Sequence, residues 1–272
     1  MSQQFDPELH RQMGVEADVV LRVGMLLMGA GTSGYRVLRG MKRSARALGF
    51  DHLDATVGLT QITCTFHRGE YFRTVIARQH SPAVDASRIE ALEDLTHNRL
   101  YAGITAQELA AMLDVIEFGV KKRWSGLVLS FAAAIACAAF AYLNFFPLEA
   151  VGLVALAAFA GQFVRYTVLH RHVHQIGGVI AGGATASIVF FLLTAFFGAI
   201  GSVDPSELSS GVVAAVLFLI PGFPLFSALI DIARFDLDAG IVRLGYAFTV
   251  IFTATFTVSM VSWLTQLTPD PV

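Results

Sequence analysis

Charged residues are scarce in this chain: they make up 15% of its 272 residues, whereas soluble domains carry about 25%. Hydrophobic residues make up 55% of the sequence, and the mean hydropathy is +0.62. The formal net charge is only −2, which argues against the basic surface that a nucleic-acid partner requires. This composition is typical of a protein embedded in a lipid bilayer.

Cysteine is rare too: the chain has two, Cys64 and Cys137. They lie far apart and form no CxxC motif, which argues against a disulfide framework and a structural zinc site. We expect both to be small apolar core residues. The N-terminal segment lacks a charged region followed by an apolar run, so the sequence predicts no cleaved signal peptide.

The second half of the chain contains five apolar segments of about 20 residues, the length that crosses about 30 Å of hydrocarbon. These segments cover residues 125–145, 149–168, 176–200, 210–232 and 241–264. The sequence therefore predicts an α-helical polytopic membrane protein with five transmembrane helices and an N-terminal cytoplasmic α+β domain. The cytoplasmic domain is expected over residues 1–120 and the transmembrane domain over residues 121–272.

Cations set the predicted orientation, because short loops rich in Lys and Arg stay on the cytoplasmic side. The cations beyond residue 120 all fall on one side of the spans; they are Lys121, Lys122, Arg123, Arg165, Arg171, Arg234 and Arg243. The loops NFFPLE and GSVDPSELSS on the other side contain none. We expect a multi-pass protein of the cell inner membrane with a cytoplasmic N-terminus and the C-terminal TPDPV outside.

An odd number of spans is informative, because two five-span units in opposite orientations form the inverted-repeat plan of many secondary transporters. The chain contains no second copy of its five spans, so we expect the other half to be a separate membrane subunit or another copy of this chain. Gly178 and Gly182 in the third span form a small face that favours close helix packing, either within the chain or against another subunit.

The fourth span contains LIPGFPL, the stretch most suggestive of transport chemistry. Pro221 and Pro224 each lack an N–H group and clash with the preceding turn, and Gly222 loosens the backbone between them. We therefore expect the helix to break there and to present the N-terminus of its second half to a carboxylate. The alternative is a proline kink that only shapes packing.

Polar side chains follow this break. Ionisable groups near membrane depth usually face partners or a pathway. Asp231 could accept a substrate ammonium group or a proton, and Arg243 could pair with Asp231 or with a substrate carboxylate. The alternative is a solvated cytoplasmic interface. The candidate substrate site comprises Pro221, Gly222, Phe223, Pro224, Ser227, Asp231 and Arg243.

Two further patterns have a structural alternative. Thr249, Thr253 and Thr257 recur every fourth residue, so they either line a substrate pathway or bond back to the carbonyls of their own helix. The histidines of HRHVH, residues 170–174, alternate in sequence and have no adjacent Cys or carboxylate, which favours headgroup contact over a metal site. No metal or cofactor is predicted.

The pattern of apolar and polar residues predicts a small α+β domain in the first 120 residues. Apolar periodicity predicts a helix on either side of GAGTSG, a β-hairpin with strands at 55–66 and 70–77, and helices at 85–101 and 105–119. GAGTSG matches the dinucleotide fingerprint, but a helix rather than a strand precedes it, which argues against a Rossmann enzyme. A Ser-His-Asp hydrolase would need a strand–turn–helix elbow that is equally lacking, so no enzyme is predicted.

Five motifs resemble the threonine/serine exporter family over nearly the whole chain, and in particular the larger subunit of its split, two-chain members. They are the helix motif at 31–37 with Ser33 and Arg36, the hairpin, RW at 123–124, RHVHQ at 171–175, and LIPGFPL at 219–225 with Asp231. The resemblance implies export of threonine and serine by fused members and of C4-dicarboxylates such as succinate by split ones. It also implies proton coupling and a second, smaller membrane subunit.

These observations predict a secondary exporter of small carboxylate-bearing metabolites, and they leave the amino acid and dicarboxylate alternatives open. The alternative is a membrane-anchored sensor or regulatory subunit whose cytoplasmic domain binds a ligand or partner. Tethering requires a single span and no interrupted helix, so five spans with PGFP argue against that alternative.

Overall fold

The structure is a computed structural model, and it describes residues 7–79, 84–120, 123–171, 173–200 and 211–266. The chain divides into two compact units. The first contains residues up to Arg123 together with Phe223–Gly245, and the second contains Trp124–Gly222 and the residues from Tyr246 onward. The sequence-based division at residue 120 assigns residues 223–245 to the transmembrane domain, whereas the structure packs them with the first unit.

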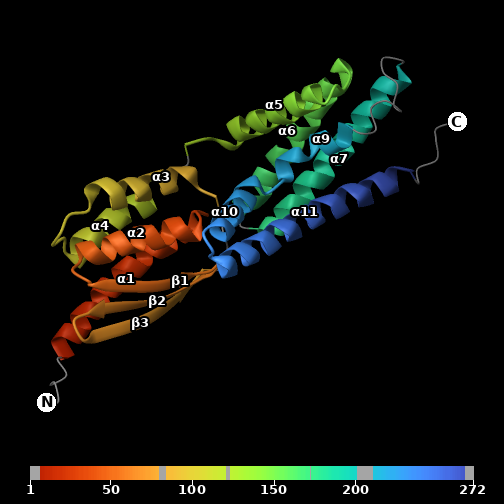
Figure 1. The fold of residues 1–272 in the computed structure, drawn as a ribbon. Coiled ribbons are helices and arrows are strands. Elements are labelled where there is room, and N and C mark those ends of the chain that lie inside the picture. Colours follow the sequence, from red (N-terminus) through yellow and green to blue (C-terminus); the bar gives the residue numbers. More distant parts are fainter. Residues whose placement is uncertain (1–6, 80–83, 121–122, 172, 201–210, 267–272) are drawn as a thin grey trace. The chain divides into compact units, whose positions relative to one another are not determined.

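Three layers make up the main part of the first unit. Its elements are α1 (Pro7–Gly29), α2 (Gly34–Ala47), β1 (His52–Val57), β2 (Gln61–Arg68), β3 (Tyr71–Arg78), α3 (Ala86–Asp94), the π-helical turn η1 (Leu95–Arg99) and α4 (Ala106–Gly119). Helices α1 and α2 cover one face of the sheet, and α3 and α4 pack on the other side of these helices (Figure 1).

The sheet is antiparallel in the order β1-β2-β3. Strands β2 and β3 form the predicted hairpin, with Arg68 opposite Tyr71 at the turn. The prediction of one strand over residues 55–66 is wrong, because a turn at Gly58 divides this stretch between β1 and β2. The Gly58 N–H donates to the Gln61 carbonyl at 2.8 Å, which closes the turn. Alternation of side chains continues on both sides of the turn, so periodicity alone did not reveal it.

The capping box predicted for α4 is present. The Thr105 side chain accepts a hydrogen bond from the Glu108 N–H at 3.2 Å, and the Glu108 carboxylate accepts one from the Thr105 N–H at 2.9 Å. Each group satisfies a donor that the helix cannot satisfy by itself. Helix α4 therefore begins where the sequence predicts.

The core of the first unit lies between β2 and the helices. Ile62, Cys64 and Phe66 point from β2 into this core, and each is at most 1% exposed. Cys137 lies in a separate core in the second unit, so both cysteines are the apolar core residues that the sequence predicts. Burial raises the pKa of the Cys64 thiol to about 12, because the thiolate would lose its hydration.

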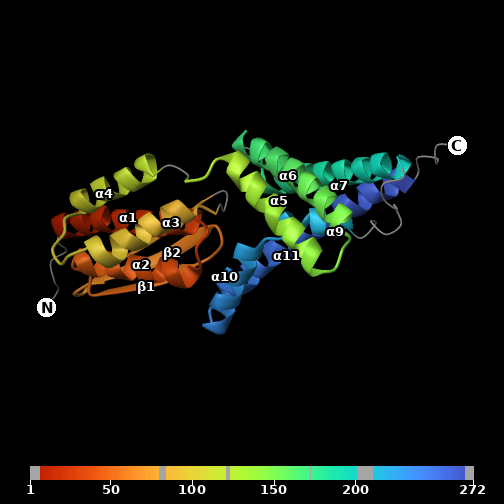
Figure 2. The same cartoon turned by 90° about the horizontal axis from the view of Figure 1, so that it is seen from above.

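The second unit is a bundle of apolar helices. It contains α5 (Gly126–Leu143), α6 (Leu148–His170), α7 (Gln175–Ala199), α9 (Gly211–Ala215), the 3-10 turn η2 (Leu217–Leu219) and most of α11 (Leu237–Gln266). Figure 2 shows α5, α6 and α7 grouped with α9; α6 packs against both α5 and α7, and α9 contacts all three helices.

Four of the five predicted spans are helices long and apolar enough to cross a membrane, namely α5, α6, α7 and α11. The predicted fourth span consists instead of α9, η2 and α10 (Gly222–Ala233). Helix α10 has 12 residues and is therefore about 18 Å long, too short to span hydrocarbon alone. The predicted outer loop at residues 201–210, the cations Lys121 and Lys122, and the C-terminal TPDPV lie outside the described residues.

Small residues let α6 and α7 touch along their backbones. A Cβ atom built on Gly161 would lie 2.7 Å from the Gly182 carbonyl oxygen, and one on Gly182 would lie 3.1 Å from the Gly161 carbonyl oxygen. A Cβ on Gly183 would lie 3.0 Å from Leu219 of η2. The small face of α7 therefore packs within the chain, which is one of the two alternatives that the sequence left open.

We expect Cys64 to resist thiol reagents in the native protein. In a Cys137→Ser background, a maleimide at pH 8 should label Cys64 only after denaturation, because the native thiol is buried and protonated. The unfolded thiol ionises near pH 8.5, so the stabilising effect of a neutral Cys64 is complete below that pH and declines as the pH rises toward 12. Equally fast labelling of native and denatured protein would contradict this assignment.

Candidate functional site

The backbone of the predicted fourth span is interrupted at Pro221. The Ile220 N–H donates to the Leu217 carbonyl at 3.1 Å, which ends η2, and the Gly222 N–H donates to the Ile220 carbonyl at 2.8 Å. Pro221 has no N–H to continue the helix, so α10 begins afresh at Gly222. Pro224 lies in the first turn of α10, where proline is tolerated, so it starts the second helix rather than helping to break the first.

The interruption exposes part of the backbone. A Cβ atom built on Gly222 would have no atom within 4 Å, and the Ile220 and Phe223 side chains are 50% and 40% exposed. Ser227, one turn further along α10, is buried. In the first turn of α10 the Gly222 N–H already donates to the Ile220 carbonyl and Pro224 has no N–H, so the Phe223 N–H is the donor of this turn that an anion could use.

Arg165 of α6 contacts the chain just before the break. With Pro221 three residues further on, the Phe218 carbonyl cannot accept the N–H that a continuing 3-10 helix would supply. Arg165 Nη1 lies 3.4 Å from this carbonyl and 3.5 Å from Gln162 Oε1. Arg165 Nε is buried and makes no hydrogen bond. Sequence reasoning used Arg165 only to set orientation, although its place five residues before the end of an apolar helix was a usable signal.

Asp231 and Arg243 form a buried ion pair in the first unit. Arg243 Nη1 donates to Asp231 Oδ2 at 2.6 Å, and the two side chains are 5% and 0% exposed. The sequence suggested that Arg243 pairs either with Asp231 or with a substrate carboxylate, and in the structure it pairs with Asp231. The binding of substrate by either residue stays a prediction.

The same carboxylate lies at the N-terminus of α2. Asp231 Oδ2 accepts a hydrogen bond from the Gly34 N–H at 3.3 Å, and Oδ1 accepts one from the Tyr35 N–H at 3.5 Å. Ser33 is the buried N-cap residue of α2, but its own side chain makes no capping hydrogen bond. The glycine-rich stretch GAGTSG thus does present a helix N-terminus to an acid, and the acid belongs to this chain.

Residues around this pair fix the turn between α10 and α11. The guanidinium of Arg234 lies 3.6 Å from the centre of the Tyr35 ring, a cation–π contact. The Asp236 N–H donates to the Asp231 carbonyl at 3.0 Å, which closes the turn. Arg36, the other residue singled out in this motif, is exposed on the first turn of α2.

The threonines of α11 bond to their own helix. Thr253 Oγ1 donates to the Thr249 carbonyl and Thr257 Oγ1 to the Thr253 carbonyl, both at 2.8 Å. This is the structural alternative that the spacing allowed, and a substrate pathway along Thr249 and Thr253 stays a prediction.

The histidine run shows no metal-binding arrangement in the part of the chain that is described. His174 caps α7, since its Nδ1 accepts a hydrogen bond from the Ile176 N–H at 3.3 Å. His172 lies outside the described residues. Among the described residues, no cluster of three or more His, Cys, Asp and Glu side chains could hold a metal ion.

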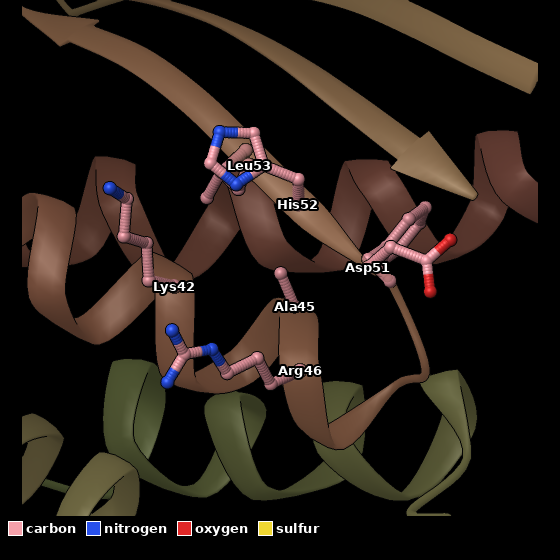
Figure 3. A pocket seen from close by; sticks show the side chains of 7 residues that line it. Lys42, Ala45, Arg46, Asp51, His52 and Leu53 are labelled. Atoms are coloured by element: carbon pink, nitrogen blue, oxygen red, sulfur yellow. The ribbon is translucent and has the colours of Figure 1, made fainter. Parts of the chain in front are cut away.

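A small pocket in the first unit was missed by the sequence reasoning. Its volume is about 50 Å³, and its polar lining residues are Lys42, Arg46, Asp51 and His52 (Figure 3). His52 Nε2 lies 2.9 Å from Asp54 Oδ1, so this ring nitrogen already has a hydrogen-bond partner. The residues come from α2 and the start of β1, a juxtaposition that depends on the fold rather than on a motif.

A small α+β unit and a bundle of apolar helices with an interrupted segment define a multi-pass membrane protein. The ThrE family, described as "Putative threonine/serine exporter", matches residues 18–265. The chain belongs to this family.

Two curated relatives cover most of the chain. The "Probable succinate transporter subunit YjjP" of Escherichia coli strain K12 is 22% identical over 255 residues, which are 90% of this chain and 92% of that protein. The protein of the same name from Klebsiella aerogenes is 23% identical over 208 residues, covering 75% of this chain and 76% of that protein. No solved structure matches the chain.

Removing one member of the buried pair should destabilise the protein. Asp231→Ala leaves the Arg243 charge buried without its partner, and breaking such a pair costs about 3–5 kcal/mol. We expect a lower apparent melting temperature in detergent and reduced amounts of protein in the membrane. The double variant Asp231→Ala/Arg243→Ala should recover part of the loss, because it leaves no unpaired charge.

The matched control is the exposed pair between Arg11 and Glu8, where Arg11→Ala should leave the melting temperature unchanged. A melting temperature of Asp231→Ala equal to that of the wild-type protein would contradict a structural role for the pair. So would a double variant as unstable as the worse single variant.

Proposed function

We propose that this chain is one half of a secondary exporter that moves small carboxylate-bearing metabolites out of the cytoplasm. Family membership over residues 18–265 supports an exporter rather than an enzyme. The names of the two curated relatives support a succinate transporter made of more than one subunit. The observation that carries the proposal is the interrupted backbone at Pro221 in the middle of an apolar segment.

In this proposal α9, η2 and α10 together form the fourth of five crossings. An interrupted crossing is tolerated in lipid only where protein buries it or water reaches it, which is how many transporters build their binding sites. An odd number of crossings puts the two termini on opposite sides, and the distribution of cations favours a cytoplasmic N-terminus and an outer C-terminus. The protein then lies in the inner membrane, and movement against a partner half opens the site to either side.

The charges favour a dicarboxylate over a zwitterion. An amino acid substrate needs an acid for its ammonium group, and Asp231 is the acid that the sequence suggested. The Asp231 oxygens already accept hydrogen bonds from Arg243, Gly34 and Tyr35, and the side chain is fully buried. We therefore assign Asp231 to holding α10 against α2, and we take a C4-dicarboxylate such as succinate as the substrate, exchanged with protons.

The partner in this proposal is a second, smaller membrane subunit. A single five-span unit supplies one half of an inverted-repeat transporter, and the second half has the opposite orientation. The experiment therefore uses proteoliposomes that contain this chain with a co-expressed second subunit, loaded with labelled succinate or threonine. Efflux of succinate that requires both chains is the expected result, and absence of efflux of either compound would overturn the proposal.

Closing the break should abolish this efflux. Pro221→Ala restores an N–H to the helix, and Gly222→Leu places a side chain over the exposed backbone, where the structure leaves room for it. We expect the double variant to lose at least tenfold in succinate efflux while its amount in the membrane stays normal.

The control is Gly152→Ala on α6, another exposed glycine whose Cβ would have no atom within 4 Å. It should transport like the wild-type protein. Normal efflux by the Pro221→Ala/Gly222→Leu variant would show that the break only shapes packing.

A further inference from the structure

The Arg165 side chain is half-buried in the membrane unit, and the hydrogen-bonding capacity of its guanidinium is largely unused. It has five N–H donors in a planar fork. Its two hydrogen bonds, to the Phe218 carbonyl and Gln162 Oε1, are long at 3.4 and 3.5 Å, and both use Nη1. Nε is buried without a partner. An unpaired buried donor on a charged group is costly, so a ligand that satisfies it would bind favourably.

No acid of the described second unit balances this charge. Among the described residues of this unit, Glu149 is the only acid. It lies at the opposite end of α6, 16 residues from Arg165. A rise of 1.5 Å per residue separates their backbones by about 24 Å. None of the ion pairs between described residues includes Arg165. The Arg165 charge is therefore not neutralised by any described acid of the membrane unit, so it is available to an anion.

The side chain points toward the break rather than toward the near end of its helix. Arg165 lies five residues before the end of α6 at His170, and a solvated arginine would extend toward that end. Its guanidinium instead reaches back toward Gln162 and across to Phe218, three residues before Pro221. Gly182 of α7 makes room for the stem, because a Cβ there would lie 2.9 Å from Arg165 Cβ. The helix packing therefore holds the charge next to the interruption.

We propose that Arg165 binds one carboxylate of the transported substrate at the break. This inference rests on the proposed function and adds to it the residue that recognises the substrate. Guanidinium and carboxylate match in a bidentate geometry, and Nε together with one Nη provides the two parallel donors. The Phe218 carbonyl and Gln162 Oε1 contact Nη1, and the substrate carboxylate takes the other donors. A cation with no acid beside it among the described residues of its unit selects an anion and offers nothing to an ammonium group.

The test compares Arg165→Gln, Arg165→Lys and the wild-type chain, each with the co-expressed second subunit in proteoliposomes. We expect Arg165→Gln to raise the KM for succinate at least tenfold, with little change in the amount of folded protein. Arg165→Lys keeps the charge but loses the fork, so it should recover part of the affinity. Millimolar succinate should raise the melting temperature of the wild-type complex and leave that of Arg165→Gln unchanged.

The matched control is Arg171→Gln, which removes an exposed cation at the end of the same helix and should leave the KM unchanged. An unchanged KM and an unchanged succinate-induced shift in Arg165→Gln would overturn this inference while leaving the exporter proposal intact. A loss of folded protein in Arg165→Gln, with the KM of the remainder unchanged, would also overturn it, because Arg165 would then serve packing alone. Absence of succinate efflux from the wild-type complex would instead reject the exporter proposal.

Discussion

The membrane part of this protein depends on one constraint: Pro221 has no backbone N–H to donate. Without it the hydrogen-bond ladder of the apolar segment stops after η2, and a separate helix, α10, starts at Gly222. The same omission leaves the Phe218 carbonyl open to Arg165. It also makes α10 a short helix whose far end carries Asp231 into a buried contact with α2. One imino acid thus interrupts the apolar segment and leaves the Phe218 carbonyl next to a cation.

The buried Asp231 carboxylate explains the glycine-rich stretch that resembles a dinucleotide fingerprint. Gly31, with a φ of +92°, follows the end of α1 in the left-handed conformation, and the chain turns there into α2. The first N–H groups of α2 then meet a carboxylate, as they would meet a phosphate in a Rossmann fold. Arg243 supplies the counter-charge at 2.6 Å. The motif therefore presents a helix N-terminus to an anion, as in a Rossmann fold, but the anion is the Asp231 side chain rather than a ligand.

Most of the secondary structure could be predicted from the sequence, because apolar periodicity and capping residues act locally. The four long spans, α4 with its Thr105 cap and the β2–β3 hairpin all follow from such local signals. The turn at Gly58 was missed, since alternation continues through it. Contacts between distant segments could not be predicted. The pairing of Asp231 with α2 joins residues nearly 200 positions apart, and the approach of Arg165 to Phe218 depends on how α6 packs against η2.

The most direct test of the account asks whether water and substrate reach the backbone at the break. Gly222→Cys, in a chain whose two native cysteines are replaced by alanine, is exposed in membranes to a hydrophilic thiol reagent with and without succinate. We expect rapid labelling of Gly222→Cys that succinate slows, and no labelling of Leu192→Cys, at an exposed apolar position on α7. Labelling of Gly222→Cys as slow as that of Leu192→Cys would place the break against lipid and contradict the account.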